Sequence, residues 1–82
     1  MRDHYLTICT RGRDIEVTHI DRGSYIEILF EQATNGGFNT LLMDNNGRIL
    51  SCSGFNASDV QFLTDFLVSN LSVIIDESRG NL

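Results

Sequence analysis

Turn-forming residues divide this chain into short segments, and this division is the feature that most restricts its fold. Glycine, asparagine, aspartate and serine gather at residues 11–14, 21–24, 35–37 and 44–47, and a further glycine stands at position 54. These residue types supply the backbone conformations that tight turns need. Turn signals at intervals of about ten residues, with apolar and polar residues alternating between them, predict a meander of antiparallel strands.

The segments between the turns are predicted to be strands, and residues 25–32 give the clearest pattern. Ile26, Ile28 and Phe30 share one wholly apolar face, and the residues between them form a mixed face. A strand of this kind is expected at the centre of the sheet. The other strands are predicted over residues 4–10, 14–20, 38–44 and 48–53.

The two ends of the predicted sheet carry further signals. In the first segment, alternation places Leu6 and Ile8 on one face and Tyr5 on the opposite face. After the last segment, Gly54 allows the chain to change direction. The sheet is therefore expected to end at this glycine.

The residues that follow carry the signals of one amphipathic helix. Ser58, with Gln61 three residues later, fits a capping box, and Asn56 offers an alternative N-cap. Gly80 marks the expected end of the helix. The main apolar face consists of residues at helical spacing, namely Val60, Leu63, Leu67, Val68, Leu71, Ile74 and Ile75.

A second apolar strip lies beside this face and consists of Phe62, Phe66 and Val73. The strip widens the apolar arc beyond the roughly 100° that a surface helix needs, so another surface must cover it. A curled sheet wrapping the helix is one explanation, and self-association or a partner protein is the other. A further alternative ends the helix near Asn70 and makes residues 71–76 a sixth strand, because this segment is rich in β-branched residues.

These patterns predict a single α+β domain over residues 1–82, an antiparallel meander of about five short strands with one C-terminal helix packed on one face. Hydrophobic residues make up 41% of the chain, which is ordinary for a globular domain. No segment approaches the roughly 20 apolar residues that span a membrane, and the N-terminus lacks the apolar run of a signal peptide. We therefore expect a cytoplasmic protein.

The charge of the chain restricts its partners. Eleven acidic residues face six arginines, there is no lysine, and the net charge is −5. Phosphate backbones and anionic lipids repel such a domain, so direct binding to nucleic acid or membrane is not expected, whereas a basic protein partner is. The alternative is that the charge serves solubility alone. A basic patch could form from Arg2, Arg11, Arg13 and Arg22, although interleaved aspartates favour a mixed surface.

Catalysis and metal binding are not expected. Cys9 or Cys52 could act as a nucleophile with His4 or His19 as its base, but both cysteines fall in predicted strands without a local catalytic signature. The same four residues could bind a metal only if they converged, and their spacing matches no metal-binding pattern. We therefore expect two free thiols, no cofactor and no enzyme activity.

Carboxylates are the candidate partner-binding residues. Two of them share one face of the third predicted strand, and the others lie on the predicted helix. Carboxylates distributed in this way can oppose an arginine-rich groove that normally holds a nucleic-acid backbone. An ordinary solvated surface is the alternative for any one of them. The six candidates are Glu27, Glu31, Asp59, Asp65, Asp76 and Glu77.

In size, acidity and layout of strands and helix, the chain resembles small inhibitors that phages and mobile elements direct at host nucleases, including anti-CRISPR and anti-restriction proteins. The resemblance implies a non-enzymatic protein that occupies a basic, nucleic-acid-binding groove of its partner. The alternative is a small homodimeric assembly domain of a bacterial accessory protein. Such a dimer would form through the strip of Phe62, Phe66 and Val73 or through an unpaired edge strand.

Overall fold

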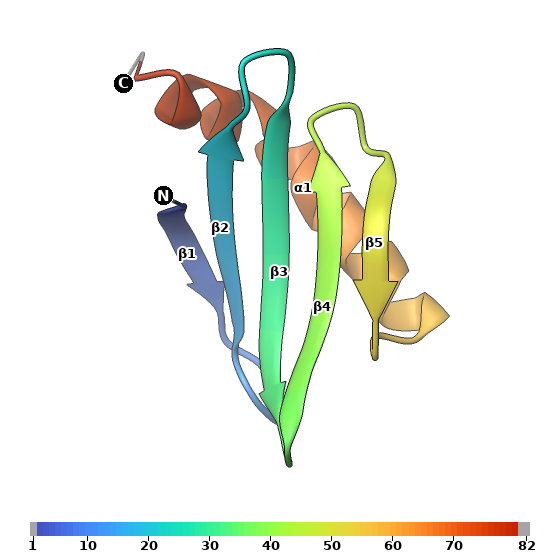
Figure 1. Cartoon of the computed structure of the whole chain (residues 1–82). Helices are drawn as coiled ribbons and strands as arrows, with labels where there is room; N and C mark the ends of the chain where they lie inside the picture. Colours follow the sequence, from blue (N-terminus) through green and yellow to red (C-terminus); the bar gives the residue numbers. More distant parts are fainter. Residues whose placement is uncertain (1, 81–82) are drawn as a thin grey trace.

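The computed structural model describes residues 2–80 and contains one sheet and one helix (Figure 1). Each strand pairs antiparallel with the next one in the chain, so the sheet has the order β1-β2-β3-β4-β5. This arrangement confirms the predicted α+β meander with a C-terminal helix. The elements are β1 (Asp3–Ile8), β2 (Ile15–Asp21), β3 (Ile26–Thr34), β4 (Gly37–Asp44), β5 (Ile49–Ser53) and α1 (Ala57–Ser78).

The helix runs diagonally across one face of the sheet and encloses the hydrophobic core against it (Figure 1). β3 is the central strand, and its residues Ile26, Ile28 and Phe30 are fully buried, as the sequence predicted. On the helix, Leu63, Leu67 and Ile74 are buried against the sheet. The buried apolar side chains are Ile15, Val17, Ile26, Ile28, Phe30, Leu41, Met43, Phe55, Leu63, Leu67 and Ile74.

The first strand differs from the sequence prediction. It ends at Ile8, and its pairing with β2 is interrupted by a bulge between His4 and Leu6. A bulge inserts an extra residue, so the residues on either side of it no longer alternate between faces. Tyr5 therefore packs against the core together with Leu6 and Ile8, and its predicted position on the opposite face was wrong.

The other strand boundaries lie within two residues of the predicted ones. The largest shift is in β3, which continues to Thr34 and pairs there with Gly37. Only Asn35 and Gly36 then form the turn, and Gly36 has a φ of 112°, a conformation that side-chain-bearing residues rarely adopt. The short turn explains why both strands are longer than predicted.

The helix begins at the alternative cap. The Asn56 side chain accepts a hydrogen bond from the Asp59 N–H at 2.8 Å, and the Asp59 carboxylate accepts one from the Asn56 N–H at 3.3 Å. The predicted box from Ser58 to Gln61 was therefore wrong, because this helix already has its first turn at Ser58. The helix continues without interruption to Ser78, so the alternative of a sixth strand was also wrong.

Replacing Asn56 with alanine is expected to lower the free energy of unfolding by about 1 kcal/mol, because an N–H of the first turn loses its acceptor. Ser58→Ala is the matched control and should change stability little, since Ser58 is exposed inside the first turn. Urea unfolding followed by circular dichroism measures both values. Equal losses in the two variants would contradict the assigned cap.

Candidate protein-binding face

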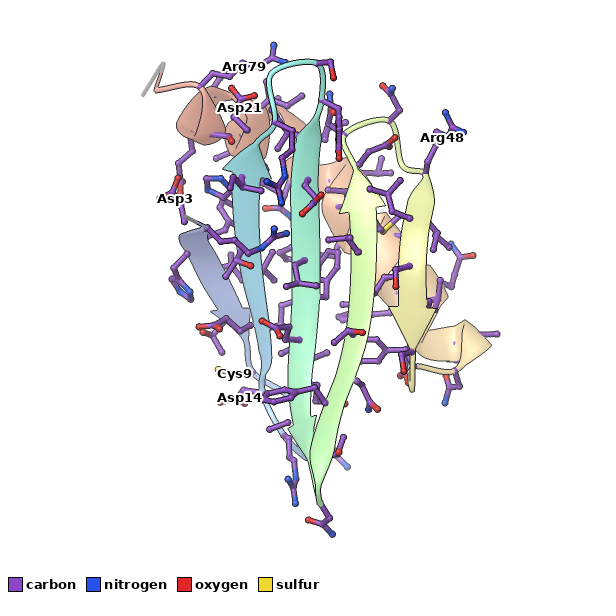
Figure 2. All side chains as sticks on the ribbon, viewed as in Figure 1. Asp3, Cys9, Asp14, Asp21, Arg48 and Arg79 are labelled. Carbon is purple, nitrogen blue, oxygen red and sulfur yellow. The ribbon has the colours of Figure 1, made fainter. Side chains whose placement is uncertain are left out.

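The sheet face opposite α1 is the candidate binding surface, and we call it the open face. No other element among residues 2–80 packs over it, and Figures 1 and 2 view the molecule from this side. Its side chains alternate along the strands with those of the core. In the three central strands the open face consists of Glu16, Thr18, Ile20, Glu27, Leu29, Glu31, Ala33, Phe38, Thr40, Leu42 and Asp44.

The middle of the open face is apolar. Leu29 on β3 and Leu42 on β4 lie directly opposite each other and are both half-buried. Phe38 lies near the start of β4, opposite Ala33, and 61% of its surface is exposed. Apolar side chains on an uncovered sheet face provide the area that a protein partner could bury.

Two carboxylates stand beside this apolar region. Glu16 on β2 and Glu31 on β3 are cross-strand neighbours, and neither makes an ion pair with an arginine of residues 2–80. Glu16 lies beside the imidazole of His4, whose Nδ1 is 3.5 Å from Glu16 Oε2. Like charges directly opposite each other destabilise a sheet, and a cation placed against both would remove that cost.

Glu16 was not among the residues predicted from the sequence. The importance of Glu16 comes from the register between β2 and β3, which the alternation within a single strand does not reveal. The signal that could have revealed it is the turn at residues 21–24, since a hairpin turn sets which residues of its two strands are opposite.

Glu27 has a structural role that the sequence did not reveal. Its Oε1 atom lies 2.6 Å from Arg2 Nη1 and 3.3 Å from Arg22 Nη2, and only 10% of its side chain is exposed. The pKa of Glu27 is lowered mainly by the hydrogen bond from Arg2, and the hydrogen bond from Arg22 lowers it further. Because its charge is already paired, Glu27 contributes little attraction for a partner.

The four predicted acids of the helix lie on the other side of the sheet from Glu27 and Glu31. Asp59 belongs to the capping box, and Glu77 Oε1 lies 3.2 Å from His19 Nε2. Asp65 is exposed and accepts a hydrogen bond from Gln61, and Asp76 is half-buried. The structure therefore divides the six candidates between two sides of the molecule, and one flat partner surface cannot contact them all.

The predicted apolar strip is not continuous in the structure. The Phe66 ring packs edge-to-face against Phe30 and Tyr5, with centroid separations of 6.1 and 6.4 Å. Phe62 and Val73 remain exposed, at 53% and 44%. Of the two explanations for the wide apolar arc, packing against the sheet accounts for Phe66.

A buried polar group lies beneath the second half of the helix. His19 is fully buried, and its Nδ1 atom has no hydrogen-bond partner among residues 2–80. Beside it, the Tyr5 hydroxyl donates to Asn70 Oδ1 at 2.9 Å. Burial, and then the nearby Glu77 carboxylate, raises the pKa of Tyr5. These contacts hold β1, β2 and α1 together.

The cysteines and arginines that were candidate functional residues do not form a common site. Cys9 is exposed after β1 and Cys52 is exposed on β5, at opposite edges of the sheet. The basic patch does not form, because Arg2 and Arg22 pair with Glu27 while Arg13, before the start of β2, hydrogen-bonds to Asn35. A shallow hollow of about 380 Å³ lies beside Arg13, lined by Gly12, Arg13, Gln32, Ala33, Thr34 and Asn35.

Comparison of the chain with models of protein families, with curated proteins and with solved structures gave no match. Within residues 2–80, no helix has both the length and the apolar character required to cross a membrane.

Proposed function

We propose that this protein is a non-enzymatic binding protein that occupies a basic surface of a protein partner with its open face. The observation that carries the proposal is the cross-strand pair of Glu16 and Glu31 beside the apolar contact of Leu29 and Leu42. A surface that is apolar at its centre and charged beside it is typical of protein interfaces.

The charge of the partner follows from these carboxylates. A guanidinium or ammonium group seated between Glu16 and Glu31 would separate two like charges that the isolated protein holds side by side. The net charge of −5 would in addition attract a basic partner at long range. The nucleic-acid-binding groove of a nuclease has the required basic character, so an inhibitor of the anti-CRISPR or anti-restriction type is the biological role that we propose.

Binding is tested with a pair of double variants that remove equal charge from opposite sides of the sheet. Glu16→Gln with Glu31→Gln neutralises the open face, and Asp65→Asn with Asp76→Asn neutralises two acids of the helix. The tagged proteins are exposed to source-cell lysate, the retained basic proteins are identified, and the affinity of each variant for the purified partner is measured.

We expect the open-face variant to lose about tenfold or more in affinity, a loss of about 1.4 kcal/mol or more, and the helix variant to lose much less. Binding should weaken as salt is raised from about 0.1 to about 0.5 M, where exposed charges are strongly screened. Equal losses in the two variants would show that net charge matters and the open face does not. Retention of no basic protein would contradict the proposal as a whole.

A further inference from the structure

A second candidate interaction surface is the outer edge of β5, which is independent of the open face. β5 is one of the two edge strands, and all five of its residues are exposed. Its pairing with β4 uses one edge only, and its outer backbone groups make no hydrogen bond to another element among residues 2–80. Unpaired strand edges of this kind are the usual sites of sheet extension.

The residues of β5 lack the charges and prolines that often prevent such pairing. The strand contains no charged residue and no proline, and its Ile49 and Leu50 are 52% and 45% exposed. Both edge strands contain a bulge, but β1 at the opposite edge also begins with a charged residue, Asp3. Charged residues protect edge strands, so β5, which has none, is the less protected edge.

We propose that two copies of this chain pair through their β5 edges in antiparallel orientation, forming one sheet that continues across the dimer. A twofold axis through Ser51 would place Leu50 of each copy opposite Cys52 of the other, with no charged residue between them. Two molecules that each carry a charge of −5 repel one another elsewhere, and this edge lets them meet without opposed carboxylates.

The ends of the strand are complementary in charge. Arg48 precedes β5, stands exposed at the end of the sheet in Figure 2, and makes no ion pair within residues 2–80. Asp59 lies just beyond the other end of β5, in the first turn of α1. Antiparallel pairing would bring Arg48 of each copy toward the end where Asp59 of the other copy lies, and opposite charges favour that orientation.

The dimer should be weak. β5 is only five residues long, and its pairing with β4 is irregular between Ile49 and Ser51, which leaves Leu50 as an extra residue. An interface limited to this edge belongs to the small class, below about 1,200 Å², that is typical of transient association. We therefore expect dimers that form as the protein concentration is raised.

Sedimentation velocity over a wide range of protein concentration tests the pairing, with two variants that each add one negative charge at an exposed apolar position. Leu50→Glu places like charges on both copies at the β5 edge, and Val68→Glu places the same charge on α1, where Val68 is 66% exposed. We expect the wild type and Val68→Glu to dimerise alike and Leu50→Glu to remain monomeric. A monomeric wild type, or a Leu50→Glu variant that still dimerises, would overturn the proposal.

Cross-linking provides a second readout that does not depend on a change in the strand. Cys9→Ser retains Cys52 on β5, and Cys52→Ser retains Cys9 at the other side of the sheet. With a short bismaleimide, the variant that retains Cys52 should give covalent dimers at least tenfold faster than the variant that retains Cys9. Equal rates would mean that the copies do not meet at β5. Loss of binding to a basic partner would not affect either result.

Discussion

Replacing Phe30 with alanine is expected to remove about 3–5 kcal/mol from the free energy of unfolding. Phe30 is fully buried on the central strand, and its ring packs edge-to-face on Phe66 of the helix. A small domain has a total stability of about 5–15 kcal/mol, so the variant should unfold at a much lower urea concentration than the wild type. Chemical unfolding followed by circular dichroism gives the value.

The matched control is Phe38→Ala on β4. Phe38 lies on the open face with 61% of its surface exposed, so the same change there should cost less than about 1 kcal/mol. The comparison tests which face of the sheet the helix covers. A larger loss for Phe38→Ala than for Phe30→Ala would contradict the described packing.

Replacing Glu27 with glutamine is expected to cost about 1.5–3 kcal/mol at neutral pH, because the charge that accepts hydrogen bonds from Arg2 and Arg22 is lost. The value should lie toward the lower end, since 48% of the Arg22 side chain is exposed and solvent weakens that pair. Glu31→Gln is the control on the same strand and face. It should be neutral or slightly stabilising, because it removes the repulsion from Glu16.

The same residue predicts a pH dependence. The pKa of Glu27 is lower in the folded protein than in the unfolded chain, so the folded state releases this proton more readily. Its contribution to stability is therefore fully present above the unfolded pKa of about 4.3 and is lost as the pH falls through the lower folded value. The difference in unfolding free energy between wild type and Glu27→Gln should shrink as the pH falls below the unfolded pKa and through the lower folded pKa of Glu27. A constant difference would contradict the paired state of Glu27.

Much of the fold could be predicted from local patterns. The alternation of Ile26, Ile28 and Phe30 indicates a strand with one buried face. The turn residues between the strands predict a meander, because a short turn lets each strand pair with its neighbour. The helix was predictable for the same reason, since its apolar spacing and its cap are properties of nearby residues. Ser58 and Asn56 both satisfied the sequence pattern of a cap, and the pattern alone could not decide between them.

The candidate site was harder to predict because it depends on pairs of residues that are distant in the sequence. The bulge at Tyr5 shifts the faces of β1, and no residue type at that position signals it. Glu27 and Glu31 are both glutamates on the same face of β3, so the sequence pattern does not distinguish them. In the structure Arg2, which is 25 positions away, pairs with Glu27. The opposition of Glu16 and Glu31 likewise requires the register of two strands.

The order of strands in the sheet bears on how the chain can assemble. Every strand pairs with the strand next to it in the sequence, so each hairpin can close over a short loop before any distant contact is made. Low sequence separation between contacting residues is associated with rapid folding. The contacts between β1 and α1, such as Tyr5 with Asn70 across 65 positions, bring the two ends of the chain together. Closing the chain over so many residues makes these contacts the ones with the greatest loop entropy to overcome.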